Sequence, residues 1–117
     1  MDSEIKKKLA RNWFKILQEV ICKEIEDLEN TSNKFITTNW NRNLSKDEGG
    51  GEYRILKNGK IFEKVGVNFS EVYGKLPKEI SKKIPGSNLN TNFWASGISV
   101  VMHMKNPHIP AMHFNTR

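Results

Sequence analysis

The sequence predicts an α+β fold, in which an antiparallel β-sheet is flanked by helices. In the first thirty residues, apolar side chains recur at helical spacing. Two strand-like runs, Glu52 to Lys57 and Lys60 to Phe69, are separated by Asn58-Gly59. This dipeptide predicts a hairpin with a type I′ turn, which needs φ > 0 at both positions. The stretch from Phe93 to Arg117 alternates between apolar and polar residues, as strands do. Hairpin connections make the predicted sheet antiparallel, with the helices packed on its face.

Residues 1–30 are predicted to form one long amphipathic helix. Asp2 and Ser3 are suitable N-caps, and Glu4 lies in the first turn, where the helix dipole favours a negative charge. A polar run beginning at Asn30 ends the helix. We expect the wide apolar stripe to pack against the sheet; it comprises Ile5, Leu9, Trp13, Ile16 and Val20 on one ridge and Phe14, Leu17, Ile21, Ile25 and Leu28 on the next.

Residues 35–117 are expected to be mainly antiparallel strands, beginning with the β-branched and aromatic run Phe35 to Arg42. Gly66, inside the second hairpin strand, predicts a bulge or a close backbone approach. A short helix is predicted near residues 77–84, between Pro77 and Pro85.

Three consecutive glycines, Gly49 to Gly51, end a polar loop that begins at Leu44. The simplest interpretation is a flexible turn. An anion-binding nest is the alternative. Neither of the common glycine-rich phosphate motifs surrounds the run, so the phosphate signal is weak.

Length and charge limit the classes of function. The 117 residues correspond to one small domain or a piece of a larger one. A net charge of +6 and a pI near 9.5 favour anionic partners: nucleic acid, acidic lipid or a polycarboxylate ligand. The lysines are spread along the chain, however, and there is neither a recognition-helix motif nor an RNP-like aromatic strand. We therefore expect no nucleic-acid partner.

Cys22 is the only cysteine, which excludes an internal disulfide and favours a reducing compartment. Its position among apolar helix residues predicts a small buried side chain, not a nucleophile. The sequence contains neither a signal-peptide core nor an apolar run of the roughly 20 residues that a membrane span needs. The expected location is the cytoplasm.

The last stretch carries the candidate chemistry. Period-two alternation puts Ser99, Val101 and His103 on one face of a strand, with Ile98 and its alternate neighbours on the other. After the break at Asn106-Pro107, the same rule puts His113, Asn115 and Arg117 on one face, with Met112, Phe114 and Thr116 opposite. Two adjacent strands would then share an apolar back and a polar front that lines a site.

Three interpretations compete for His103, His108 and His113. They could be partly buried, hydrogen-bonded histidines with a structural role only. They could bind a metal, although their spacing matches no common zinc pattern. The third interpretation is an acid–base histidine, His113, about 13 Å along the strand from a carboxylate-binding Arg117. That separation fits two ends of a large ligand, and Asn115 between them could donate and accept hydrogen bonds.

The sequence resembles oxygen-dependent coproporphyrinogen III oxidase over essentially its whole length. The resemblance includes RNWFKILQEVICKEIEDLE, the segment around Trp40 and GGGEYRILKNGKIFEKVGVNFSEVYGKLP. It is most specific in FWASGISVVMHMKNPHIPAMHFNTR, which contains the pattern SxxxHxxNPHxPxxHxNxR from Ser99 to Arg117.

The resemblance implies a fold and an activity. The fold would be a broad antiparallel sheet sandwiched by helices in a homodimer. The activity would be the oxidative decarboxylation of two propionates of coproporphyrinogen III to vinyl groups, with molecular oxygen as co-substrate and no organic cofactor. It further implies that His113 is the acid–base residue, that Ser99, Asn115, Thr116 and Arg117 bind substrate, and that His103 and His113 are ligands of a possible divalent metal.

The family pattern continues beyond the point where this sequence stops. The later metal-type histidines, the acidic residue that addresses the pyrrole nitrogens and the dimerisation segment have no counterpart up to Arg117. We therefore expect an N-terminal portion of one coproporphyrinogen oxidase-type domain, residues 1–117, with a sheet that is incomplete at its C-terminal side. The alternative is a catalytically inactive remnant that needs a partner or the missing part.

Overall fold

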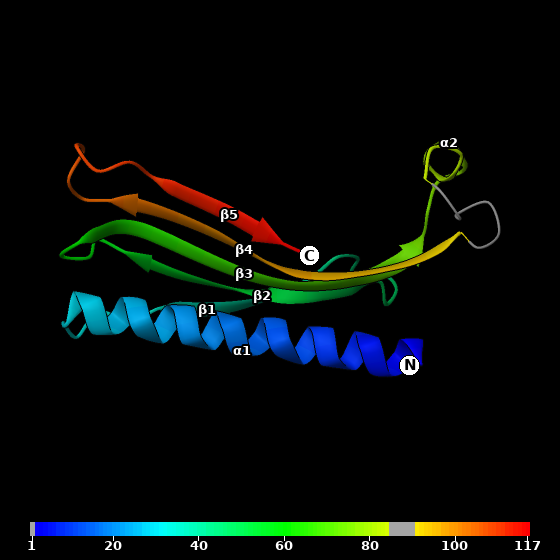
Figure 1. The fold of residues 1–117 in the computed structure, drawn as a ribbon, viewed down its shortest axis with the longest axis horizontal. Helices are drawn as coiled ribbons and strands as arrows, with labels where there is room; N and C mark the ends of the chain where they lie inside the picture. The colour runs from blue at the N-terminus through cyan, green and yellow to red at the C-terminus, as the bar shows by residue number, and fades with distance from the viewer. Residues whose placement is uncertain (1, 85–90) are drawn as a thin grey trace.

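A computed structural model describes residues 2–84 and 91–117 of the protein. A five-stranded antiparallel sheet, in the order β1-β2-β3-β4-β5, carries one long helix along it (Figure 1). The elements are α1 (Ser3–Glu29), β1 (Ile36–Asn41), β2 (Gly49–Lys57), β3 (Phe62–Lys75), α2 (Lys78–Ser81), β4 (Asn92–Met104) and β5 (Met112–Thr116). This arrangement confirms the predicted α+β class.

Helix α1 begins and ends where local chemistry predicts. The Asp2 side chain caps it by accepting a hydrogen bond of 3.0 Å from the backbone N–H of Glu4. Asn30 ends the helix in the left-handed conformation, with φ of 51°, a role that asparagine tolerates well. The predicted helix over residues 1–30 is therefore confirmed.

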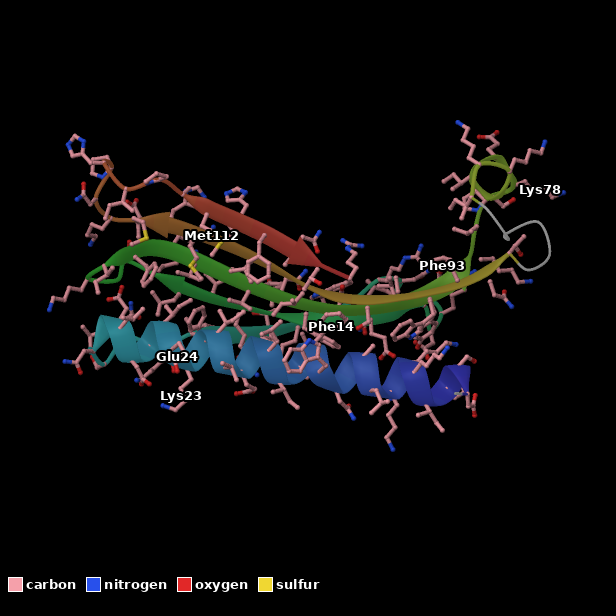
Figure 2. The ribbon with its side chains drawn as sticks, viewed as in Figure 1. Phe14, Lys23, Glu24, Lys78, Phe93 and Met112 are labelled. Atoms are coloured by element: carbon pink, nitrogen blue, oxygen red, sulfur yellow. The ribbon has the colours of Figure 1, made fainter. Side chains whose placement is uncertain are left out.

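The core is a single layer between α1 and one face of the sheet. Phe14 lies between the helix and the strands, whereas Lys23 projects from the outer side of α1 (Figure 2). The buried apolar side chains come from α1 and from the three central strands; they are Phe14, Cys22, Ile25, Leu56, Phe62, Val65, Val67, Phe69, Ile98 and Val100. Burial of Cys22 raises the pKa of its thiol to about 12, which makes it the inert small side chain that the sequence predicts.

Only one of the two predicted apolar ridges of α1 packs on the sheet. On the ridge that contains Phe14, Phe14 and Ile25 are buried and Leu17 and Ile21 are partly buried, although Leu28 at its end is 61% exposed. The members of the other ridge remain 50–57% exposed: Ile5, Leu9, Trp13, Ile16 and Val20. A single helix on a sheet contacts it along one side, so the second ridge has no surface to meet. The radius of gyration is 17.2 Å, against about 13 Å for a compact chain of this length. The expectation that the whole stripe packs on the sheet is therefore wrong.

The β2–β3 hairpin is present, but its turn differs from the predicted two-residue type I′ turn. Asn58 has a positive φ of 55°, whereas Gly59 is not among the residues with positive φ. The loop spans residues 58–61, closed by hydrogen bonds from Asn58 N to Glu63 O and from Gly59 N to Phe62 O. The wider loop lets its backbone N–H groups reach a buried carboxylate of α1, that of Glu29.

The glycine run is a strand and not a flexible turn or an anion nest. Gly50 and Gly51 pair with β1 on one side and with β3 on the other, so their backbone groups take part in the sheet and not in an anion-binding nest. The Gly49 N–H donates to the Asp47 side chain. A Cβ added at Gly51 would lie 2.8 Å from the indole ring of Trp40. Glycine is needed there because a large side chain from β1 lies across β2.

Gly66 makes neither a bulge nor a close contact within the described chain. It pairs regularly with Ile55 and Val101, and a Cβ built on it would meet nothing within 4 Å. The register shift in β3 falls between Phe62 and Lys64 instead, next to the hairpin loop. The predicted bulge or close backbone approach at Gly66 is therefore wrong.

The predicted short helix is present as α2, which is shorter than expected and continues as a turn to residue 83. The end predicted for it at Pro85 lies outside the described residues. None of the described helices combines the length and the hydrophobicity that a membrane crossing requires.

Candidate functional site

Strand β4 has the two faces that alternation predicts. Ile98 and Val100 are at most 1% exposed and pack under α1. Ser99, Val101 and His103 consequently point to the other side of the sheet. We call this side, which α1 leaves uncovered, the open face.

Pairing of β4 with β5 brings the predicted site residues together on the open face. Ser99 lies opposite Asn115, and Val101 lies opposite His113. His103 and His113 are diagonal neighbours, with ring centroids 5.6 Å apart and an interplanar angle of 69°. Two histidines ten residues apart in sequence therefore form one edge-to-face pair.

Arg117 lies at the other end of this group, beside a glycine. A Cβ added at Gly97 would be 2.8 Å from Cγ of Arg117, so the arginine stem lies over the bare backbone of β4. Along β5, His113 and Arg117 are separated by about 13 Å, as their spacing requires. A guanidinium therefore marks one end of the group and an imidazole pair marks the other.

Two other predicted residues lie elsewhere. Thr116 pairs with Ile98, so its side chain is on the face of the sheet that carries α1, and only its backbone lies along the edge strand. His108 is in the turn between β4 and β5, where its backbone N–H donates to the Asn106 side chain. His108 is therefore not part of the histidine pair.

A row of hydrogen-bonding side chains crosses the entire sheet on the open face, and local sequence patterns missed most of it. The strand registers place its members side by side over about 19 Å, one from each strand: Thr38, Tyr53, Asn68, Ser99 and Asn115. We call this the polar row. Alternation within each strand assigns a residue to a face, but only the pairing register shows that five polar residues align.

Trp40 extends the site toward β1. Its indole ring lies across Gly51, and its Nε1–H donates a hydrogen bond of 3.1 Å to Oδ1 of Asn68. Trp40 therefore reaches the middle of the polar row from the edge strand. The adjacent triple glycine was the sequence signal that could have pointed to it.

The open face is electropositive. Lys57 and Lys64 lie in one row with His103 of the histidine pair, and Arg117 lies at the opposite end of the face. In the described strands, no aspartate or glutamate occupies the paired positions of the open face between the lysine row and the row of Gly51 and Gly97. Because opposite charges attract, this surface suits a ligand with several carboxylates.

The histidine pair offers part of a metal site. Imidazole nitrogen is a common ligand for divalent metals. The described residues contain no group of three or more histidine, cysteine, aspartate or glutamate side chains that could hold an ion. His103 and His113 would thus supply two donors, fewer than the three or four protein ligands usual in such sites.

Comparison with known proteins agrees with the family resemblance of the sequence. Residues 9–117 match the family described as coproporphyrinogen III oxidase. The chain belongs to this family. It is 46% identical over 119 residues to the oxygen-dependent coproporphyrinogen-III oxidase of Rickettsia felis, 45% identical to that of Rickettsia akari and 44% identical to that of Rickettsia typhi.

The match to these oxidases is nearly complete for this chain and partial for them. It covers 95% of the chain but only 41% of each of the three relatives. The chain thus corresponds to an N-terminal portion of a coproporphyrinogen III oxidase, as its sequence predicts. The residues that resemble the family's site, from Ser99 to Arg117, fall within the matched range.

Proposed function

We propose that this polypeptide contributes one wall of the active site of an oxygen-dependent coproporphyrinogen III oxidase. The observation that carries the proposal is the assembly of Ser99, His103, His113, Asn115 and Arg117 on the open face, at strand positions where the described pairs carry no aspartate or glutamate. Family membership gives the reaction class, and the face supplies groups whose chemistry suits it.

The reaction converts a propionate side chain to a vinyl group. For each propionate, one carbon–carbon bond to the carboxylate breaks and carbon dioxide leaves. The two electrons and the hydrogen lost from the side chain, with one further proton, reduce molecular oxygen to hydrogen peroxide. No organic cofactor is needed for this balance, and proton transfer is the step that a positioned side chain can assist.

His113 is the proposed acid–base group. It lies on the exposed edge strand beside His103, and histidine is the side chain that acts most often in acid–base catalysis. Arg117 is proposed to bind a carboxylate of the substrate through its planar guanidinium, and Asn115 and Ser99 to donate to other polar atoms. Thr116 would contribute through its backbone, because its side chain lies on the other face.

Metal, assembly and location are proposed on the resemblance alone. A divalent ion held in part by His103 and His113 would supply a positive charge near a substrate carboxylate, and the remaining ligands would come from outside the described residues. The enzyme is proposed to be a homodimer in the cytoplasm.

The test is protoporphyrinogen formation from coproporphyrinogen III under air, with purified chain and with a His113→Ala variant. His103→Ala is the matched control, since it removes the neighbouring imidazole from the same face. Loss of turnover in His113→Ala that exceeds the loss in His103→Ala supports the acid–base role. Equal turnover by the wild type and His113→Ala would refute that role.

A second candidate is a catalytically inactive chain that needs further polypeptide to work. The observation that favours it is exposure: every residue of β5 is exposed, as is the outer apolar ridge of α1. An open wall orients a flexible tetracarboxylate poorly, because positioning requires contacts from several sides. Wild-type chain that binds coproporphyrin III but forms no product would identify this case.

A further inference from the structure

Asn68 has a fixed side-chain orientation on the open face. The indole N–H of Trp40 can only donate, so the Asn68 atom 3.1 Å from it must be the carbonyl oxygen Oδ1. The amide nitrogen Nδ2 then faces away from Trp40 with two N–H donors. Trp40 itself is held by packing of its ring over Gly51.

The donors of Asn68 have no partner in the described parts of the chain. Within residues 2–84 and 91–117, the structure assigns no hydrogen bond to Asn68 Nδ2, to Ser99 Oγ or to the Asn115 side chain. Asn68 and Ser99 are directly paired across β3 and β4, which places their Cβ atoms about 5 Å apart. Two hydrogen-bond donors thus converge next to each other on the open face.

There is room for a ligand beside this pair. Gly66, two residues before Asn68 on the same face of β3, has nothing within 4 Å of where its Cβ would be. It lies between Val101 and Ile55 in the register, one row from Asn68. The surface is therefore open next to the unpaired donors, and Val101 and Ile55 flank this opening.

We propose that Asn68 is a substrate-binding residue that donates a hydrogen bond to a carboxylate of the ligand, with Trp40 as the positioning residue that sets its orientation. This inference rests on the proposed function and extends the binding surface from β4 and β5 onto β3. A ligand with four carboxylates can engage Arg117 with one arm and the Asn68–Ser99 pair with another, because these groups lie on neighbouring rows of the open face. The described strand pairs place no aspartate or glutamate in either row.

The test is fluorescence titration of the chain with coproporphyrin III, the stable oxidised form of the porphyrinogen. Asn68→Asp is the decisive variant, because it keeps an oxygen for the Trp40 N–H but replaces the donor with a negative charge. Loss of a hydrogen bond to a charged group predicts affinity lower by about ten- to a hundredfold. Asn12→Asp makes the same change on an exposed position of α1 and should leave the affinity unchanged.

Trp40→Phe separates positioning from packing. Phenylalanine keeps a ring over Gly51 but cannot donate, so Asn68 loses its fixed orientation and affinity should fall by about three- to tenfold. In an Asn68→Asp background, the same Trp40 change should have little further effect, because contacting residues are coupled. If Asn68→Asp does not fold, the proposal is tested by the affinity of Trp40→Phe for coproporphyrin III, and an unchanged affinity refutes it.

The outcomes distinguish this inference from the proposed function. If wild-type chain binds coproporphyrin III and Asn68→Asp binds it equally or more tightly, the role of Asn68 is refuted and the proposed function stands. An equal loss in Asn68→Asp and Asn12→Asp would also refute it, since the effect would then be one of net charge. A wild-type chain that does not bind the porphyrin would overturn the proposed function for this chain, and this inference with it.

Discussion

The buried carboxylate of Glu29 is expected to hold the β2–β3 hairpin to the end of α1. Glu29 is 0% exposed, and its two oxygens accept backbone N–H groups of the hairpin loop: Lys60 at 2.5 Å, Ile61 at 2.9 Å and Phe62 at 2.7 Å. Burial alone would raise the pKa of this carboxyl group. The three N–H donors and nearby Lys105 outweigh burial, so the pKa of Glu29 is lowered from its ordinary value.

Replacing Glu29 with glutamine tests this arrangement with little change in shape. The amide oxygen of glutamine can still accept hydrogen bonds from the N–H groups of Ile61 and Phe62. The Lys60 N–H then faces the amide nitrogen, and the negative charge of the carboxylate is lost. A hydrogen bond to a charged group is worth about 1.5–3 kcal/mol, so Glu29→Gln should lower the free energy of unfolding by about that amount at pH 7. Urea denaturation followed by circular dichroism measures it.

The pH dependence gives a second, independent readout. Because the folded-state pKa of Glu29 lies below its unfolded value of about 4.5, the stability that its carboxylate adds to the folded chain is fully present above that pH. It is lost as the pH falls through the lowered folded-state pKa. The stability gap between wild type and Glu29→Gln should therefore be constant from pH 7 to about pH 5 and shrink below that.

Glu24→Gln is the matched control for this experiment. Glu24 is on the same helix but exposed, so its substitution should change the free energy of unfolding by less than about 0.5 kcal/mol. The reasoning fails if Glu29→Gln is no more destabilising than Glu24→Gln, or if the gap persists unchanged at pH 3.

Three further predictions concern other contacts of the fold. Burial raises the pKa of Cys22 to about 12, so its thiol should not react with a thiol reagent at pH 8 in the folded chain and should react at once in urea. The Tyr73 phenol donates a hydrogen bond to the Asp47 carboxylate, which raises the pKa of Tyr73 above its ordinary value of 10. In Asp47→Asn, the tyrosine absorbance titration at high pH should therefore move to lower pH. An unchanged midpoint would contradict this contact. Gly97→Ala would place a methyl group 2.5 Å from the Thr116 carbonyl oxygen. We expect the free energy of unfolding to fall by about 1–3 kcal/mol and amide exchange in β5 to become faster. Unaltered exchange would show that β5 adjusts without cost.

Period-two alternation was sufficient to assign faces within single strands. It placed Ser99 and His103 opposite Ile98, and His113 and Arg117 opposite Thr116, as the structure confirms. This works because side chains of a strand alternate whatever the strand pairs with. Helix α1 was predictable for a similar reason, since its caps and its period of 3.6 residues are local properties.

The failures have a common origin in contacts between distant segments. The triple glycine looked like a loop because glycine has low strand propensity, but Gly51 is a strand residue under the Trp40 ring. The Asn58-Gly59 turn took a different form because Glu29, some thirty residues earlier, binds the loop backbone. Local preference is weak compared with such interactions.

Local patterns in the chain were enough to predict the α+β class, the long helix, the faces of the last two strands and, through the Ser99–Arg117 motif, membership of the coproporphyrinogen III oxidase family. Tertiary contacts determine which ridge of α1 packs on the sheet, that Trp40 reaches Asn68, and that five polar residues align across five strands. The physical reason is strand register, which depends on turns and on packing between strands far apart in the chain, and which no local periodicity specifies.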